Sequence, residues 1–151
     1  MVSCFDVADY FIWLSQETGS FISNLQLQKL VYYAQAWYLG VYGEPLFQDD
    51  FEAWVHGPVI PVLYRAFKDF GWRPIEVADR SLEGLPENVF QHLDDVAEEY
   101  FGCSGFELER MTHAEDPWIR ARGGAAPDEL SSNIIQKSWI KEYFSTRVQE
   151  Q

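Results

Sequence analysis

The side chains with the greatest potential for chemistry are three histidines, two cysteines and one isolated lysine. His56, His92 and His113 lie far apart in the sequence, and neither Cys4 nor Cys103 has a second ligand nearby, so their spacing does not indicate a metal site. The sequence contains no phosphate-binding glycine loop and no GxSxG or HExxH pattern. The cysteines lack CxxC spacing, which is typical of inert thiols in a reducing compartment. We therefore expect neither a metal nor a cofactor.

The isolated lysine, Lys29, is the only formal charge in an aromatic run from Leu25 to Gly43. The apolar residues of this run recur at helical spacing, and its opposite side is also largely apolar. A helix that is apolar nearly all round is usually buried, so we predict a central helix at about residues 24–42, beginning at Asn24 and ending at Gly43. A buried ammonium needs a carboxylate or several acceptors, and we expect Lys29 to be paired.

Further helices and one extended segment surround this central helix in the predicted fold. Ser3 with Asp6 and Ser104 with Glu107 resemble capping boxes, which open helices ending near Glu17 and His113. Asp116 is the expected N-cap of a short helix. The remaining predictions are a short β-hairpin or extended segment near residues 45–55, a tight turn at 56–58, and helices over 62–70, from 86 to about 101, and over 137–148. The prediction is a mainly α, compact single domain over residues 1–151.

The charge balance limits the partners that the chain can bind. Twenty-four acidic against eleven basic side chains give a net charge of −13, which disfavours contact with nucleic acid and with anionic membranes. The same charge suits a basic protein partner, or serves solubility alone. The first residues show neither a basic nor an apolar signal region, so a cytoplasmic location is expected.

Three segments combine large apolar side chains with a few polar groups. They are the stretch of the central helix that holds Lys29, Tyr33 and Gln35, the run from Trp54 to Val59 with His56, and the run from Thr112 to Trp118 with His113. Such mixtures are more typical of the centre of a protein interface than of a catalytic pocket. Each segment could equally serve structure alone, as a paired core lysine, a tight turn or a helix corner.

Taken together, these segments resemble the Panacea domain family, which includes SocA-like antitoxins and phage-associated GepA-like proteins. The similarity extends over roughly Phe21 to Phe144. It rests on LQLQKLVYYAQAWYLGVYGEPLF, FEAWVHGPVIPVLYRAFKDFG and LERMTHAEDPWIRAR. The resemblance implies a helical, non-catalytic antitoxin that binds its toxin directly, and that in one branch of the family delivers it to the ClpXP protease. No separate DNA-binding domain is expected. The implied partner-binding residues are Lys29, Tyr33, Gln35, Trp54, His56, Gly57, Pro58, Tyr64, Thr112, His113 and Trp118.

Two other functions stay open at the level of the sequence. An acidic regulatory protein that mimics nucleic acid would need carboxylates at phosphate-like spacing along one face, and no such regular run is present. A small hydrolase or transferase using Lys29, His56 or His113 would need a perturbed lysine beside a histidine in one pocket.

Overall fold

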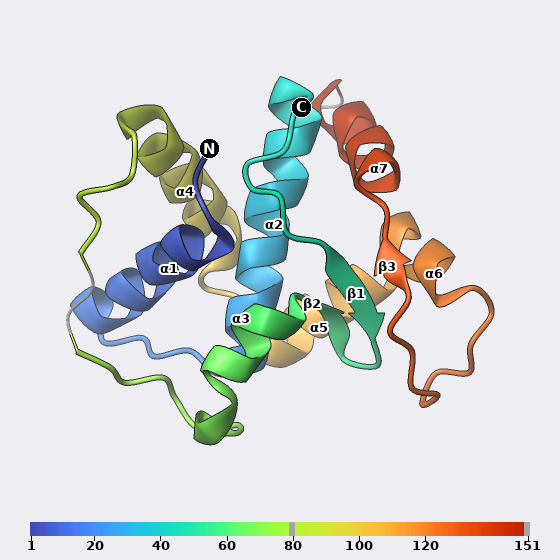
Figure 1. Cartoon of the computed structure of the whole chain (residues 1–151), viewed down its shortest axis with the longest axis horizontal. Helices are drawn as coiled ribbons and strands as arrows, with labels where there is room; N and C mark the ends of the chain where they lie inside the picture. The colour runs from blue at the N-terminus through green and yellow to red at the C-terminus, as the bar shows by residue number, and fades with distance from the viewer. Residues whose placement is uncertain (79–80, 150–151) are drawn as a thin grey trace.

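The central helix α2 (Asn24–Tyr42) forms the axis of the fold. The computed structural model describes residues 1–78 and 81–149 (Figure 1). In that view α1 (Cys4–Thr18) and α4 (Glu87–Tyr100) lie on one side of α2, and α6 (Asp116–Arg122) and α7 (Lys137–Gln149) lie on the other. The predicted mainly α fold and its central aromatic helix are confirmed.

The starts of α1 and α5 follow the predicted capping chemistry, whereas the start of α2 needs one correction. Ser3 caps α1, and Ser104 caps α5 (Gly105–His113), each through a reciprocal capping box. In α2 the N-cap is Ser23, not Asn24, because the Ser23 hydroxyl accepts from the backbone of Gln26 at 3.2 Å. The Asn24 side chain turns inward instead and donates to the carbonyl of Tyr64 at 3.0 Å.

Two further helix predictions need correction. The N-cap of α6 is Glu115, so Asp116 is the first residue of that helix. The helix expected over 62–70 is two pieces, α3 (Pro61–Ala66) and a 3₁₀ turn η1 (Lys68–Phe70). At the junction Phe67 leaves helical dihedrals, with φ −118°, and its ring is buried.

A small antiparallel sheet lies beside α2, in the strand order β2-β1-β3. The expected extended segment supplies β1 (Phe51–Trp54), and a turn at residues 55–56 leads into β2 (Gly57–Val59). The tight turn thus lies one residue earlier than expected, and Gly57 and Pro58 already belong to a strand. The third strand, β3 (Ile134–Ile135), pairs Ile135 with Phe51 and was not predicted.

The core includes an aromatic cluster between α2 and α7. The Phe144 ring lies 5.1 Å from the Trp37 ring and 6.2 Å from the Tyr33 ring, measured between centroids. The two helices approach closely at Gly40, where an added Cβ would lie 2.9 Å from the backbone of Phe144. The apolar periodicity of this run also includes Val41, but Val41 is 50% exposed and lines a surface pocket together with residues of α4.

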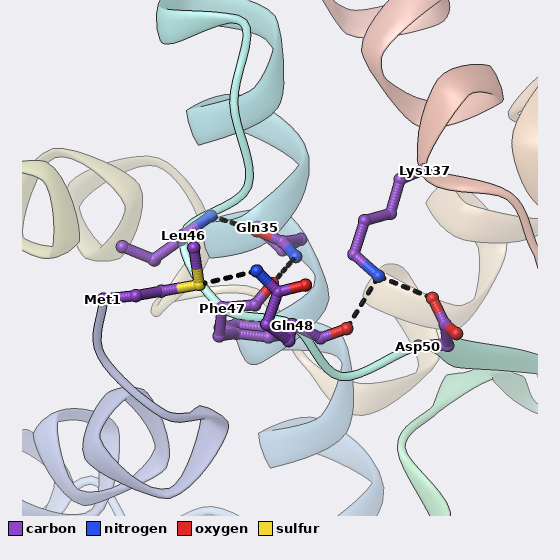
Figure 2. A network of polar contacts seen from close by, with 7 residues as sticks. All are labelled: Met1, Gln35, Leu46, Phe47, Gln48, Asp50 and Lys137. Atoms are coloured by element: carbon purple, nitrogen blue, oxygen red, sulfur yellow. Dashed lines mark hydrogen bonds and ion pairs between the residues drawn. The ribbon is translucent and has the colours of Figure 1, made fainter.

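Gln35 attaches the segment between α2 and β1 to the core (Figure 2). Its Nε2 donates to the carbonyl of Phe47 at 2.8 Å, and its Oε1 accepts from the backbone of Leu46 at 2.7 Å. At the other end of this segment Lys137 donates to the carbonyl of Gln48 and to Asp50. These contacts fix the path of the chain into the sheet.

Candidate partner-binding surface

The β1–β2 turn and the corner between α5 and α6 lie side by side in the structure. His56 Nδ1 lies 3.0 Å from Glu109 Oε1, which joins the turn to α5. Trp118 Nε1 donates to the carbonyl of Trp54 at 2.9 Å, which joins β1 to α6. The fold therefore brings together two of the three segments that the sequence singles out, although they are far apart in the chain.

Lys29 lies beneath this junction and connects the third segment to it. Gly57 has φ +126°, and a Cβ there would lie 3.1 Å from Lys29 Cε and 3.2 Å from Thr112 Oγ1. The close approach of lysine, strand and α5 therefore requires a glycine at position 57. Pro58 is buried in the same strand, opposite Ala53.

Lys29 is buried as expected, but it is not paired as expected. It is 2% exposed, and its Nζ donates to the carbonyl of Leu25 at 3.3 Å. Among residues 1–78 and 81–149, no carboxylate lies within ion-pairing distance of it. Glu109 is the acid whose charge acts on Lys29, but its Oε1 lies against His56. Burial lowers the pKa of Lys29 to about 8, and the charge of Glu109 opposes this shift.

His113 is held by stacking rather than by a full set of hydrogen bonds. Its ring lies 4.0 Å from the Trp118 ring, at an interplanar angle of 13°. Within the described residues its buried Nε2 has no hydrogen-bond partner. Burial lowers the pKa of His113, Glu109 opposes this shift, and the charge of Lys29 lowers the pKa further. Burial therefore favours the neutral form of the ring.

Tyr33 contacts the corner between α5 and α6 from inside the core. Its hydroxyl donates to Glu115 Oε1 at 2.9 Å, and its ring stacks on Tyr100 at 4.1 Å. Burial raises the pKa of Glu115 to about 7, while the hydrogen bond from Tyr33 opposes the shift. Tyr33 and Gln35 are both enclosed by the protein, so neither side chain is accessible to a partner in this structure.

A cavity of about 660 Å³ opens beside the β1–β2 turn, and we refer to it as the Trp54 pocket. Its apolar walls are Leu25, Trp54, Val55, Tyr64 and Leu130. The polar side chains at its rim include Glu52, His56 and Asp128. The Trp54 ring meets the Tyr64 ring at a centroid distance of 5.0 Å, and its Nε1 donates to Glu52 at 2.9 Å. Lys29 is not among the lining residues, so the perturbed lysine does not face this cavity.

The far wall of the Trp54 pocket is the loop at residues 128–132, which the sequence did not associate with the site. Arg122 holds this loop and is 5% exposed. Its guanidinium donates to the carbonyls of Ala53 at 3.3 Å, Ala126 at 2.6 Å and Glu129 at 2.8 Å. No local pattern in the sequence marks this loop, because Arg122 reaches a carbonyl on β1 as well as carbonyls in the loop itself.

The two cysteines and the potential metal ligands were the other candidates for chemistry. Cys4 and Cys103 are free thiols, and burial raises the pKa of Cys4 to about 12, as suits an unreactive side chain. In residues 1–78 and 81–149 no three His, Cys, Asp or Glu side chains gather to hold a metal ion. No helix in this part of the chain has the length and apolarity needed to span a membrane.

Comparison with known proteins assigns the class of protein. Residues 27–119 match the family described as antitoxin SocA-like, Panacea domain, and the chain belongs to this family. It is 47% identical over 138 residues to Antitoxin SocA of Caulobacter vibrioides, which covers 82% of this chain and 72% of that protein. No solved structure matches the chain. The predicted family is confirmed, and membership supports an antitoxin role that is regulatory rather than enzymatic.

The region that matches the family contains all eleven residues that the sequence assigns to partner binding. It includes Trp54, His56 and Tyr64 on one side of the Trp54 pocket. Asp128 and Leu130 on the other side lie beyond it. The pocket therefore combines residues inside the matched region with residues outside it.

Proposed function

We propose that this chain is an antitoxin that neutralises its toxin by direct protein–protein binding. The observation that carries the proposal is the convergence of the β1–β2 turn and the α5–α6 corner on one surface, within the region that matches the antitoxin family. His56 has a side chain that is 61% exposed and Trp54 lines a cavity, so this surface offers both polar and aromatic contacts. The buried residues Lys29, Tyr33 and Thr112 hold the surface in shape.

The partner that this surface fits is basic. The net charge of −13 favours encounter with a positively charged protein and disfavours encounter with nucleic acid. We propose no catalytic role for His113 or Lys29, because His113 is stacked on Trp118 and Lys29 is enclosed. Neutralisation then follows from occupancy of the toxin or, as the family resemblance implies, from delivery of the bound toxin to the ClpXP protease.

Co-expression with the product of the neighbouring reading frame tests this function. We expect the wild-type chain to restore growth and to co-purify with that product. His56→Ala is expected to weaken both effects without unfolding the protein, because His56 is exposed and joined to α5 by a single contact. Trp72→Ala is the matched control, since Trp72 is 87% exposed and lies outside the proposed surface.

The lifetime of the toxin separates the two routes to neutralisation. Delivery to the protease predicts that the antitoxin shortens the lifetime of the toxin only in cells that contain ClpXP. Simple occupancy predicts rescue with an unchanged lifetime. Restored growth with neither a complex nor faster loss of the toxin would contradict the proposed function.

A further inference from the structure

We propose that the Trp54 pocket binds a segment of the toxin in which a large apolar side chain lies next to a lysine or arginine. This inference rests on the proposed function and specifies where and how the toxin is recognised. It assigns a role to Asp128 and Leu130, which neither the sequence motifs nor the family match includes.

The walls of the pocket favour the large apolar side chain of the proposed toxin segment. Trp54 and Tyr64 pack ring against ring on one side, and Leu130 stands on the other with 88% of its surface exposed. A leucine this exposed buries apolar surface only when a partner covers it. The volume of 660 Å³ is within the range of roughly 300–1,000 Å³ that is usual for ligand pockets, so a large side chain fits.

The charges at the rim of the pocket favour the lysine or arginine of the proposed toxin segment. Glu52 and Asp128 line the pocket, and Glu109 lies behind His56 at 3.0 Å. Among the described residues that line the pocket there is no lysine or arginine. An anionic ligand would therefore meet only repulsion from side chains of full charge, whereas a cation beside the apolar group would be attracted.

The pocket is formed before any partner arrives. Arg122 fixes the loop through the carbonyls of Ala126 and Glu129 and ties it to β1 through Ala53. Asn133 donates to the carbonyl of Ala121 at 3.0 Å and fixes the end of the loop to α6. Because the loop is already held, little conformational entropy is lost when the toxin binds.

The two sides of the pocket come from different parts of the chain. The side with Trp54 and Tyr64 belongs to the region that matches the family, and the side with Asp128 and Leu130 lies beyond it. Variants at positions 128 and 130 therefore change the pocket outside the region that matches the family.

Titration of purified variants with the purified product of the neighbouring reading frame tests the inference. We expect Leu130→Asp and Asp128→Lys each to raise the Kd by about tenfold or more, as is typical of residues at the centre of an interface. Both side chains are exposed, so the folded state is kept. The loss caused by Asp128→Lys is expected to shrink as the salt concentration rises, whereas the loss caused by Leu130→Asp has an apolar component that persists.

Matched controls carry the same changes elsewhere on the surface. Phe106→Asp places a carboxylate at a site that is 70% exposed, and Glu83→Lys makes the same charge reversal as Asp128→Lys. Both controls are expected to bind like the wild type. If the wild type binds and the pocket variants match their controls, the inference is overturned while the proposed function stands. If the wild type does not bind at all, the proposed function fails, and the inference fails with it.

Discussion

Replacing Lys29 with methionine is expected to raise the free energy of unfolding by about 2–3 kcal/mol at pH 7. The lysine is 2% exposed, and among the described residues its Nζ donates one hydrogen bond, to the carbonyl of Leu25 at 3.3 Å. Burial lowers its pKa from 10.5 to about 8, so at pH 7 the folded protein holds a charge that its surroundings disfavour. Methionine has a similar length, fills the same space under Gly57 and carries no charge.

The pH dependence of stability gives this prediction a second readout. The folded state releases the Lys29 proton near pH 8, whereas the unfolded chain holds it to about pH 10.5. Between these values the unfolded chain binds more protons, so the contribution of Lys29 to stability rises with pH. Below pH 8 Lys29 is charged in the folded protein, so the full cost of burying this charge lowers the free energy of unfolding. Chemical denaturation at pH 7, 8 and 9 is expected to show this rise in the wild type and its loss in Lys29→Met.

The control for Lys29 is Lys141→Met, which makes the same change of net charge at an exposed position on α7. It is expected to leave both stability and its dependence on pH close to those of the wild type. A Lys29→Met protein that is less stable than the wild type at pH 7 would show that the buried ammonium is stabilised by its surroundings.

Replacing Phe144 with alanine is expected to lower the free energy of unfolding by about 3–5 kcal/mol. Phe144 is 2% exposed and lies at the centre of the contact between α7 and α2. Its ring meets those of Tyr32, Tyr33 and Trp37, so its removal leaves a cavity lined by three aromatic side chains. The backbones are already in close approach at Gly40, which limits how far the helices can move to fill the space.

Thermal or chemical denaturation measures this loss, and Phe106→Ala is the control. Phe106 is 70% exposed on α5, so its truncation is expected to change stability by less than about 0.5 kcal/mol. Equal effects of the two substitutions would mean that the aromatic cluster between α2 and α7 is not the centre of the core.

The sequence was most informative where structure depends on neighbouring residues. The capping boxes at Ser3 and Ser104 gave two helix starts, because the hydrogen bonds that define them join residues three apart. The central helix was predictable from its periodicity for a similar reason. At Asn24 the same reasoning failed, since a tertiary hydrogen bond to Tyr64 left the capping role to Ser23.

Features that depend on distant residues could not be predicted in this way. The strand β3 is two residues long and exists because Phe51 is opposite Ile135. The loop beside the Trp54 pocket is placed by Arg122, whose acceptors lie on both β1 and the loop itself. The environment of Lys29 also depends on packing, because Gly57 and Thr112 meet it where a carboxylate was expected.

Calorimetric titration of the purified chain with the purified product of the neighbouring reading frame tests the central claim most directly. We predict saturable binding with a Kd of about 1 μM or tighter, because a neutralising complex must persist at cellular concentrations. Association is predicted to slow as salt is added, since the net charge of −13 attracts a basic partner. A chain that restores growth in cells but shows no binding up to about 100 μM in this titration would contradict neutralisation by direct binding.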